Sequence, residues 1–306
     1  MNDLLSLEAT LTLPSPCEPF APEWPGSSNV NLWVKRDDAI HSVISGNKWR
    51  KLQHSLKTFS HSQIVSFGGA YSNHLHALGF TCWKLGIPLT ALVRGHESAT
   101  PSPMLQDLVK WGVDIEFVDR KTYQQRNTES YLAQLERRFD SALIIPEGGS
   151  EASAIYGIQA MVREVNNTVD FDTIMAPVAS GATLSGIVSA LTPKQSAIGI
   201  GVLKGEGYLE NLVEQFLPLS ARAHSMKTNP TQNWNINHSY HFGGYAKVTP
   251  ELREFCDTFN RTMPFHIEPV YSGKLFWALK DMLLKGAFKQ GANIVVVHTG
   301  GLQGAR

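Results

Sequence analysis

Lys48 is the first residue whose type and position suggest chemistry. It lies within the segment 45–52 (SGNKWRKL), where a small polar turn leads into a helical pattern. Ser45 or Asn47 would cap that helix and place Lys48 in its first turn. The helix dipole there disfavours an ammonium ion, so the amine is available to attack a carbonyl. The alternative is a basic residue on a solvated helix face, and these eight residues alone favour that alternative.

A second segment, residues 66–76 (SFGGAYSNHLH), ends an apolar run with two glycines and then opens a helix at about Ser72. Hydroxyl, amide and free backbone N–H groups at such a helix start suit a carboxylate or a phosphate. Alternatively, Ser72 is only an N-cap, and His74 and His76 are polar surface residues. Histidines two positions apart do not share a helix face, so we do not expect a metal site.

The third segment, residues 176–186 (APVASGATLSG), again joins a strand, a small-residue loop and a helix. Consecutive N–H groups from Gly181 to Leu184, with the hydroxyls of Ser180 and Thr183, would hold a phosphate at the helix N-terminus. The segment matches neither a Walker A loop nor a GxGxxG fingerprint. An ordinary strand-to-helix loop is the equally weighted alternative.

The elements that would position these segments alternate between strands and helices. Apolar runs predict strands that begin at Leu32, Gln63, Pro88, Asp114, Ala142, Thr173, Ser196 and Asn293. Helical spacing between them places Tyr131, Leu135 and Phe139 on one stripe. Near-continuous apolar runs are typical of parallel strands covered on both faces, so the pattern predicts a doubly wound α/β fold. Five predicted strands end in glycine, where such sheets bind ligands.

The composition is that of a folded enzyme-sized protein. The 306 residues suggest about two domains, and 42% apolar with 18% charged residues excludes disorder. Lys+Arg and Asp+Glu are both 27, so the charge balance favours neither a nucleic acid nor an anionic membrane as partner. Three widely spaced cysteines indicate a reducing compartment. With no apolar run of 18 residues and no signal-peptide pattern, we expect a cytoplasmic protein.

Seven blocks along the chain resemble the pyridoxal-phosphate enzymes of the tryptophan-synthase β type, and among them the 1-aminocyclopropane-1-carboxylate deaminase and D-cysteine desulfhydrase family. The blocks are VKRDD (34–38), GNKWRKL (46–52), GGAYSNH (68–74), PEGGS (146–150), SGATLSG (180–186), EPVYSGK (268–274) and HTGG (298–301). The resemblance implies two open, mostly parallel twisted sheets with flanking helices. It further implies a large cofactor domain (1–50 and 154–306), a small mobile domain (51–153) and a homodimer.

The resemblance also implies how pyridoxal 5'-phosphate would be bound. Lys48 would carry the cofactor as a Schiff base and transfer protons. Asn73 would contact its phenolic oxygen, and Thr299 its pyridine nitrogen. The residues implied to hold the phosphate are Gly181, Ala182, Thr183 and Leu184.

For the substrate, the resemblance implies an amino acid bound without a metal. Ser72, with the backbone of Asn73 and His74, would hold the substrate carboxylate. Tyr245 and Tyr271 would flank the substrate and the cofactor, so that the expected catalytic residues are Lys48, Ser72, Tyr245 and Tyr271.

The residue after Tyr271 separates the two activities of the family. Deaminases carry a glutamate there, which keeps the pyridine nitrogen protonated, whereas this chain has Ser272. Hydroxyls at Ser272 and Thr299 resemble the desulfhydrase pattern and predict β-elimination from a small amino acid such as D-cysteine, giving keto acid, ammonia and sulfide. The alternatives are 1-aminocyclopropane-1-carboxylate deamination and a catalytically idle small-molecule-binding protein. Trp49 and His74 depart from both patterns and leave the substrate open.

Overall fold

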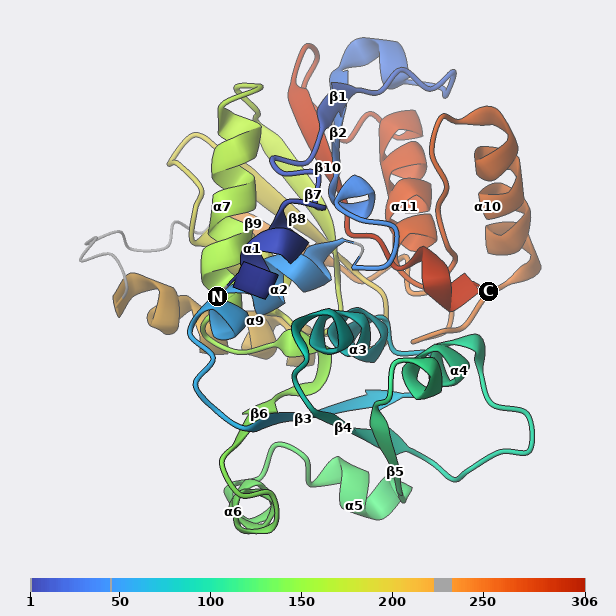
Figure 1. The fold of residues 1–306 in the computed structure, drawn as a ribbon. Coiled ribbons are helices and arrows are strands. Elements are labelled where there is room, and N and C mark those ends of the chain that lie inside the picture. Colours follow the sequence, from blue (N-terminus) through green and yellow to red (C-terminus); the bar gives the residue numbers. More distant parts are fainter. Residues whose placement is uncertain (1, 45, 223–232, 306) are drawn as a thin grey trace.

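Ten strands form two sheets in the computed structural model, which describes residues 2–44, 46–222 and 233–305 (Figure 1). The large sheet has the order β1 (Cys17–Pro19), β2 (Asn31–Arg36), β10 (Asn293–His298), β7 (Thr173–Val178), β8 (Ser196–Gly201) and β9 (Trp234–Asn237). The small sheet has the order β5 (Asp114–Val118), β4 (Leu89–Arg94), β3 (Gln63–Gly69) and β6 (Ala142–Ile145). All neighbours are parallel except β1 and β2. The predicted α/β class and the eight predicted strands are confirmed; the sequence analysis missed β1 and β9.

Both faces of the large sheet are covered by helices, and the pleat divides its central side chains between two cores. Val295 and Val297 of β10 pack into a core with α7 (Ala154–Asn166), α8 (Ala182–Val188) and α9 (Tyr208–Arg222). Their neighbours Ile294 and Val296 pack with α10 (Pro250–Thr262) and α11 (Ser272–Leu284) on the other side. Successive strand residues point to opposite faces, which explains why β10 is apolar at four successive positions, 294–297.

The small sheet repeats this arrangement. Helices α3 (Asn73–Leu85) and α4 (Pro103–Lys110) lie on one face, whereas α5 (Arg120–Gln124) and α6 (Glu129–Arg138) lie on the other (Figure 1). Ile64 of β3 packs toward α3, and its neighbour Val65 packs toward α5 and α6. The stripe predicted to contain Tyr131 and Leu135 thus belongs to α6.

Helix α2 (Asn47–Lys57) lies where the two sheets meet. Trp49, Leu52 and Leu56 join the core that α3 and α4 form with the small sheet, while the opposite side of α2 packs on α7. Gly157 permits this close packing, since a Cβ there would lie 1.8 Å from the carbonyl oxygen of Arg50. The helix crosses position 50/51, where the sequence analysis divides the domains; the division stays a prediction.

The remaining elements are short. Helix α1 (Asn2–Glu8) packs against α3, and single 3-10 turns occur at Ser27–Asn29, Asp37–Ala39, Glu147–Gly149 and Leu302–Ala305. None of the helices in the described part of the chain combines the length and the apolar character needed to cross a membrane.

Candidate functional site

The parallel strands of the large sheet bring the predicted site segments to one edge. Lys48 follows β2, Thr299 follows β10 and Gly181–Leu184 follow β7. These three strands are neighbours in the sheet, so the loops at their carboxyl ends lie side by side although they are far apart in the chain.

The turn before Lys48 is locked onto the loop after β10. Gly46 has φ 72°, and a Cβ there would lie 1.7 Å from the carbonyl oxygen of Thr299. The backbone N–H of Asn47 donates to this same oxygen (3.2 Å), and its side-chain amide donates to the hydroxyl of Thr183 (3.0 Å). Three predicted site segments are therefore joined directly.

These contacts correct one detail of the prediction. Gly46 occupies the N-cap position of α2 with no side-chain cap, and Asn47 is the first helical residue, so the expected Asn47 cap is wrong. Ser45, the other expected cap, lies outside the described residues. Lys48 does lie in the first turn, as predicted.

Lys48 differs from a lysine on a solvated face. The residue is partly buried, and burial lowers the pKa of its ammonium group to about 8. Loss of solvation disfavours the charged form, so a substantial fraction of the amine is neutral near physiological pH. Lys35, the preceding lysine, is instead fully buried, and its ammonium group is hydrogen-bonded. Its Nζ donates to Ser15 O at 2.5 Å and to Glu164 Oε2 at 2.6 Å.

The N-terminus of α3 supplies the second group of predicted residues. Ser72 is the N-cap, and its Oγ accepts the N–H of Leu75 (3.2 Å). Asn73 contacts the C-terminal segment: its Oδ1 accepts a hydrogen bond from Gln303, and a Cβ on Gly301 would lie 2.8 Å from its Nδ2. The first N–H groups of a helix have no partner within the helix, so the capping role of Ser72 is compatible with a bound anion.

His74 and His76 are buried (2% and 3% exposed), so their interpretation as surface residues is wrong. The hydroxyl of Ser66 donates to the carbonyl of Ile145 (2.8 Å) and therefore accepts from Nε2–H of His74 (2.8 Å). Burial, with Lys48 and Lys51 nearby, holds the pKa of His74 well below its usual value. The imidazole is thus neutral and turned into the protein, which leaves its backbone N–H for the predicted substrate contact.

Lys51 is a functional candidate that the sequence analysis missed. Its Nζ lies 3.3 Å from Ser150 Oγ and 3.5 Å from Ser180 Oγ, and these hydroxyls are 2.7 Å apart. The ammonium group is buried, and burial together with Lys48 lowers its pKa. A signal existed, because Lys48 and Lys51 are three residues apart and share a helix face.

These groups fit a phosphate. The hydroxyls and the ammonium group converge beside the loop 181–184, where α8 begins. Gly181 has φ 79°, and a Cβ there would lie 2.7 Å from the backbone of Leu212 on α9. The packing of this loop against α9 therefore requires glycine at position 181.

The two predicted tyrosines meet at a separate point of the same edge. Their hydroxyl oxygens are 2.9 Å apart, with Tyr245 half exposed and Tyr271 at the start of α11. The pKa of Tyr271 lies well above its usual value, mainly because the phenol is buried. Tyr245 and the carboxylates of Glu268 and Glu147 raise it further. The Tyr271 phenol is therefore protonated and able to donate.

Ser272 is bonded within its own turn. Its Oγ accepts the N–H of Glu268 (2.9 Å) and lies 3.2 Å from a carboxylate oxygen of the same residue. That carboxylate also accepts the N–H groups of Val270, Tyr271 and Ser272. Of the two hydroxyls predicted to face a pyridine ring, only that of Thr299 has no hydrogen-bond partner among the described residues.

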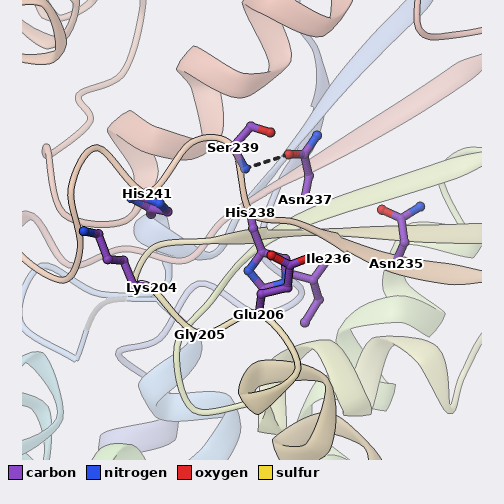
Figure 2. Close-up of a pocket in the computed structure, with 9 residues that line it drawn as sticks. All are labelled: Lys204, Gly205, Glu206, Asn235, Ile236, Asn237, His238, Ser239 and His241. Atoms are coloured by element: carbon purple, nitrogen blue, oxygen red, sulfur yellow. Dashed lines mark hydrogen bonds between the residues drawn. The ribbon is translucent and has the colours of Figure 1, made fainter.

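A hollow of about 670 Å³ lies farther along the edge, between the loop that follows β8 and strand β9 with the residues after it. Figure 2 shows its lining, which comprises residues 204–206, 235–239 and His241. The predicted site residues do not line it. Within the described ranges, no three His, Cys, Asp or Glu side chains gather as metal ligands.

Comparison with known proteins assigns the family. The profile described as "Pyridoxal-phosphate dependent enzyme" matches residues 13–300. The chain belongs to this family. It is therefore an enzyme that uses pyridoxal phosphate, and the amine of Lys48 with its lowered pKa, on the helix that Asn47 joins to the loop 181–184, fits that cofactor.

Relatives within the family agree with the predicted resemblance. A putative 1-aminocyclopropane-1-carboxylate deaminase of Pyrococcus horikoshii is 27% identical, over 90% of this chain and 86% of the relative. The mitochondrial bifunctional D-cysteine desulfhydrase/1-aminocyclopropane-1-carboxylate deaminase of Arabidopsis thaliana is 28% identical, over 92% of this chain and 75% of the relative. The crystal structure of an ACC deaminase homologue superposes with a TM-score of 0.81 at 25% identity, covering 100% of this chain and 96% of that one. The predicted family resemblance and the two-sheet fold are confirmed.

Proposed function

We propose that this enzyme catalyses β-elimination from a small amino acid, with D-cysteine as the first candidate and keto acid, ammonia and sulfide as products. The observation that carries the proposal is that the carboxylate of Glu268, four residues before Ser272, is held by hydrogen bonds within its own turn. Three backbone N–H groups and Ser272 occupy its carboxylate. No carboxylate follows Tyr271, and Thr299 offers only a hydroxyl to the ring nitrogen. A neutral partner leaves this nitrogen unprotonated, which suits removal of a proton and a good leaving group.

The residues would divide the work as follows. Pyridoxal phosphate, when bound, supplies the electron sink for negative charge at Cα. Lys48 would hold the cofactor and, with its lowered pKa, accept the Cα proton as a neutral amine. The hydroxyl of Ser72 and the N–H groups of Asn73 and His74 would orient the substrate carboxylate. Tyr245 and Tyr271 would lie on the opposite side of the substrate as hydrogen-bond partners.

The phosphate would be held at the other end of the site. The backbone of residues 181–184 and the hydroxyl of Thr183 would bind it, and Lys51 would balance its charge. Asn47 holds Thr183 in place at 3.0 Å.

A product panel tests this function. The purified enzyme is incubated with D-cysteine, L-cysteine, β-chloro-D-alanine and 1-aminocyclopropane-1-carboxylate, while sulfide, ammonia and keto acid are measured together. We expect D-cysteine and its chloro analogue to react and the cyclopropane to react weakly. Faster opening of the cyclopropane than release of sulfide would favour the deaminase alternative, which the bifunctional Arabidopsis relative keeps open. Failure of borohydride to trap the cofactor on the protein would contradict a Schiff base with Lys48.

We further propose that the enzyme works as a homodimer in the cytoplasm, and that residues 51–153 close over the substrate and exclude water. Sedimentation equilibrium of the purified protein tests the dimer: a single species of monomer mass over a wide concentration range would contradict it.

A further inference from the structure

Lys274 is a buried lysine to which the proposed reaction gives no task. It lies in the first turn of α11 and is 0% exposed. Its ammonium group donates to the carbonyl oxygens of Val202 (3.0 Å), His241 (2.9 Å) and Gly244 (2.8 Å). An ammonium group has three N–H donors, and each of them has an acceptor here.

The three acceptors belong to two loops at the edge that carries the site. Val202 directly follows β8, whereas His241 and Gly244 lie in the segment that follows β9. His241 also borders the hollow shown in Figure 2. One side chain of α11 therefore ties both loops to the helix that begins beside Tyr271.

The segment 238–247 has a backbone that needs such support. Phe242 (φ 51°) and Ala246 (φ 54°) are non-glycine residues in the left-handed region, and Gly243 and Gly244 also have positive φ. This conformation is unfavourable for residues with a Cβ and persists only where surrounding contacts hold it. Tyr245 lies in the middle of this stretch, directly after the carbonyl that Lys274 binds.

The chemistry of the contact is that of a bound monovalent cation. Carbonyl oxygens are also the ligands that surround K⁺ in proteins. Burial lowers the pKa of Lys274 to about 8, and Glu268 opposes this shift. The group is therefore mostly protonated at neutral pH, as three donated hydrogen bonds require.

We propose that Lys274 is a positioning residue: its ammonium group acts as a tethered cation that organises segment 238–247 and so sets Tyr245 against Tyr271. The 2.9 Å contact between the two phenols depends on this loop. The consequence for turnover rests on the proposed function, because it requires the tyrosines to flank the substrate. The organisation of the loop does not.

Hydrogen–deuterium exchange of segment 238–247 in the holoenzyme tests the proposal. Lys274→Ala removes the side chain and leaves room for an ion, while Lys274→Met keeps most of its volume without the N–H donors. Lys280→Ala, at an exposed position of the same helix, is the control. We expect exchange in this segment to become about tenfold faster in both Lys274 variants but not in the control. Added K⁺ or ammonium should slow it again in Lys274→Ala, whereas tetramethylammonium should not.

The outcomes decide the proposal independently of the substrate. Wild-type exchange rates in both Lys274 variants, faster exchange spread evenly over the whole chain, or no response of Lys274→Ala to K⁺ and ammonium would each overturn it. With any amino acid that the wild type turns over, kcat/KM should fall in the variants at full cofactor occupancy and recover with K⁺ in Lys274→Ala. An enzyme inactive on D-cysteine would contradict the proposed function while leaving the exchange result valid.

Discussion

Lys48 and Lys35 are chemically alike, and their surroundings distinguish them. The ammonium group of Lys35 is bound to Ser15 and Glu164, whereas Lys48 is partly buried with its pKa lowered to about 8. We predict that borohydride reduction followed by peptide mapping finds the cofactor on Lys48, and that Lys48→Ala abolishes both the adduct and turnover while the far-ultraviolet circular dichroism is unchanged. An adduct on Lys35 or Lys51 would contradict this assignment.

The lowered pKa of Lys48 also predicts a pH dependence. Covalent capture of pyridoxal phosphate by the apoprotein requires a neutral amine. With a pKa of about 8, roughly one amine in ten is neutral at pH 7 and nine in ten at pH 9. The capture rate, followed by absorbance, should therefore rise through pH 8 and level off above it. A rise centred near pH 10.5, the ordinary value for lysine, would show that the amine is solvated instead.

At the scale of elements, an ionic network fixes α2 against β2 and α7. Arg50 contacts Glu164 of α7 at 2.5 and 2.7 Å and Asp37 at 3.0 Å, and Lys35 of β2 shares Glu164 at 2.6 Å. The two cations and Asp37 are buried, so their charges depend on one another. Since α2 carries both Lys48 and Lys51, the network also sets the position of the reactive amine.

Glu164→Gln should therefore lower the free energy of unfolding by about 2–4 kcal/mol, because it leaves two buried cations with one carboxylate. Arg163→Ala, at an exposed position of the same helix, should change it by less than about 0.5 kcal/mol. Urea unfolding measures both. Burial opposes ionisation of Glu164, but Arg50 and Lys35 outweigh it and lower its pKa. The stabilisation is thus present above the ordinary pKa of glutamate and is lost as the pH falls below it. Equal midpoints for Glu164→Gln and wild type would contradict the role of the network.

At the scale of the whole molecule, the site is assembled from both sheets. The C-terminal segment, which follows β10 of the large sheet, contacts α3 of the small sheet: the Gln303 amide donates to Asn73 and to the carbonyl of Tyr71 (3.3 Å). Segments from both halves therefore meet where the proposed substrate carboxylate would lie.

Closure of residues 51–153 over the substrate should accordingly protect both partners of this contact. D-Alanine has the carboxylate and amine of the proposed substrate but no leaving group at Cβ. We predict that it slows hydrogen–deuterium exchange at residues 72–76 and at 301–304 of the holoenzyme, with no change in α10, which contains none of the proposed site residues. Protection confined to the large-sheet segments would contradict closure.

Local patterns in the sequence determine much of this protein. Runs of apolar residues predict eight strands and the fold class, since a strand covered on both faces must be apolar at successive positions. Lys48, Ser72 and the loop 181–184 could be singled out because each combines a polar group with the start of a helix.

Only the tertiary structure decided which other groups join the site, because those contacts link residues far apart in the chain. Edge strand β9 has only four residues, in which Trp234 and Ile236 alternate with asparagines, so it lacks the near-continuous apolar run that is typical of the predicted strands. The buried state of His74, the convergence of Lys51 on Ser150 and Ser180, and the binding of three carbonyls by Lys274 likewise leave no local trace. A polar side chain shows its type in the sequence, but its pKa and its role depend on solvation and on partners that the packed fold alone supplies.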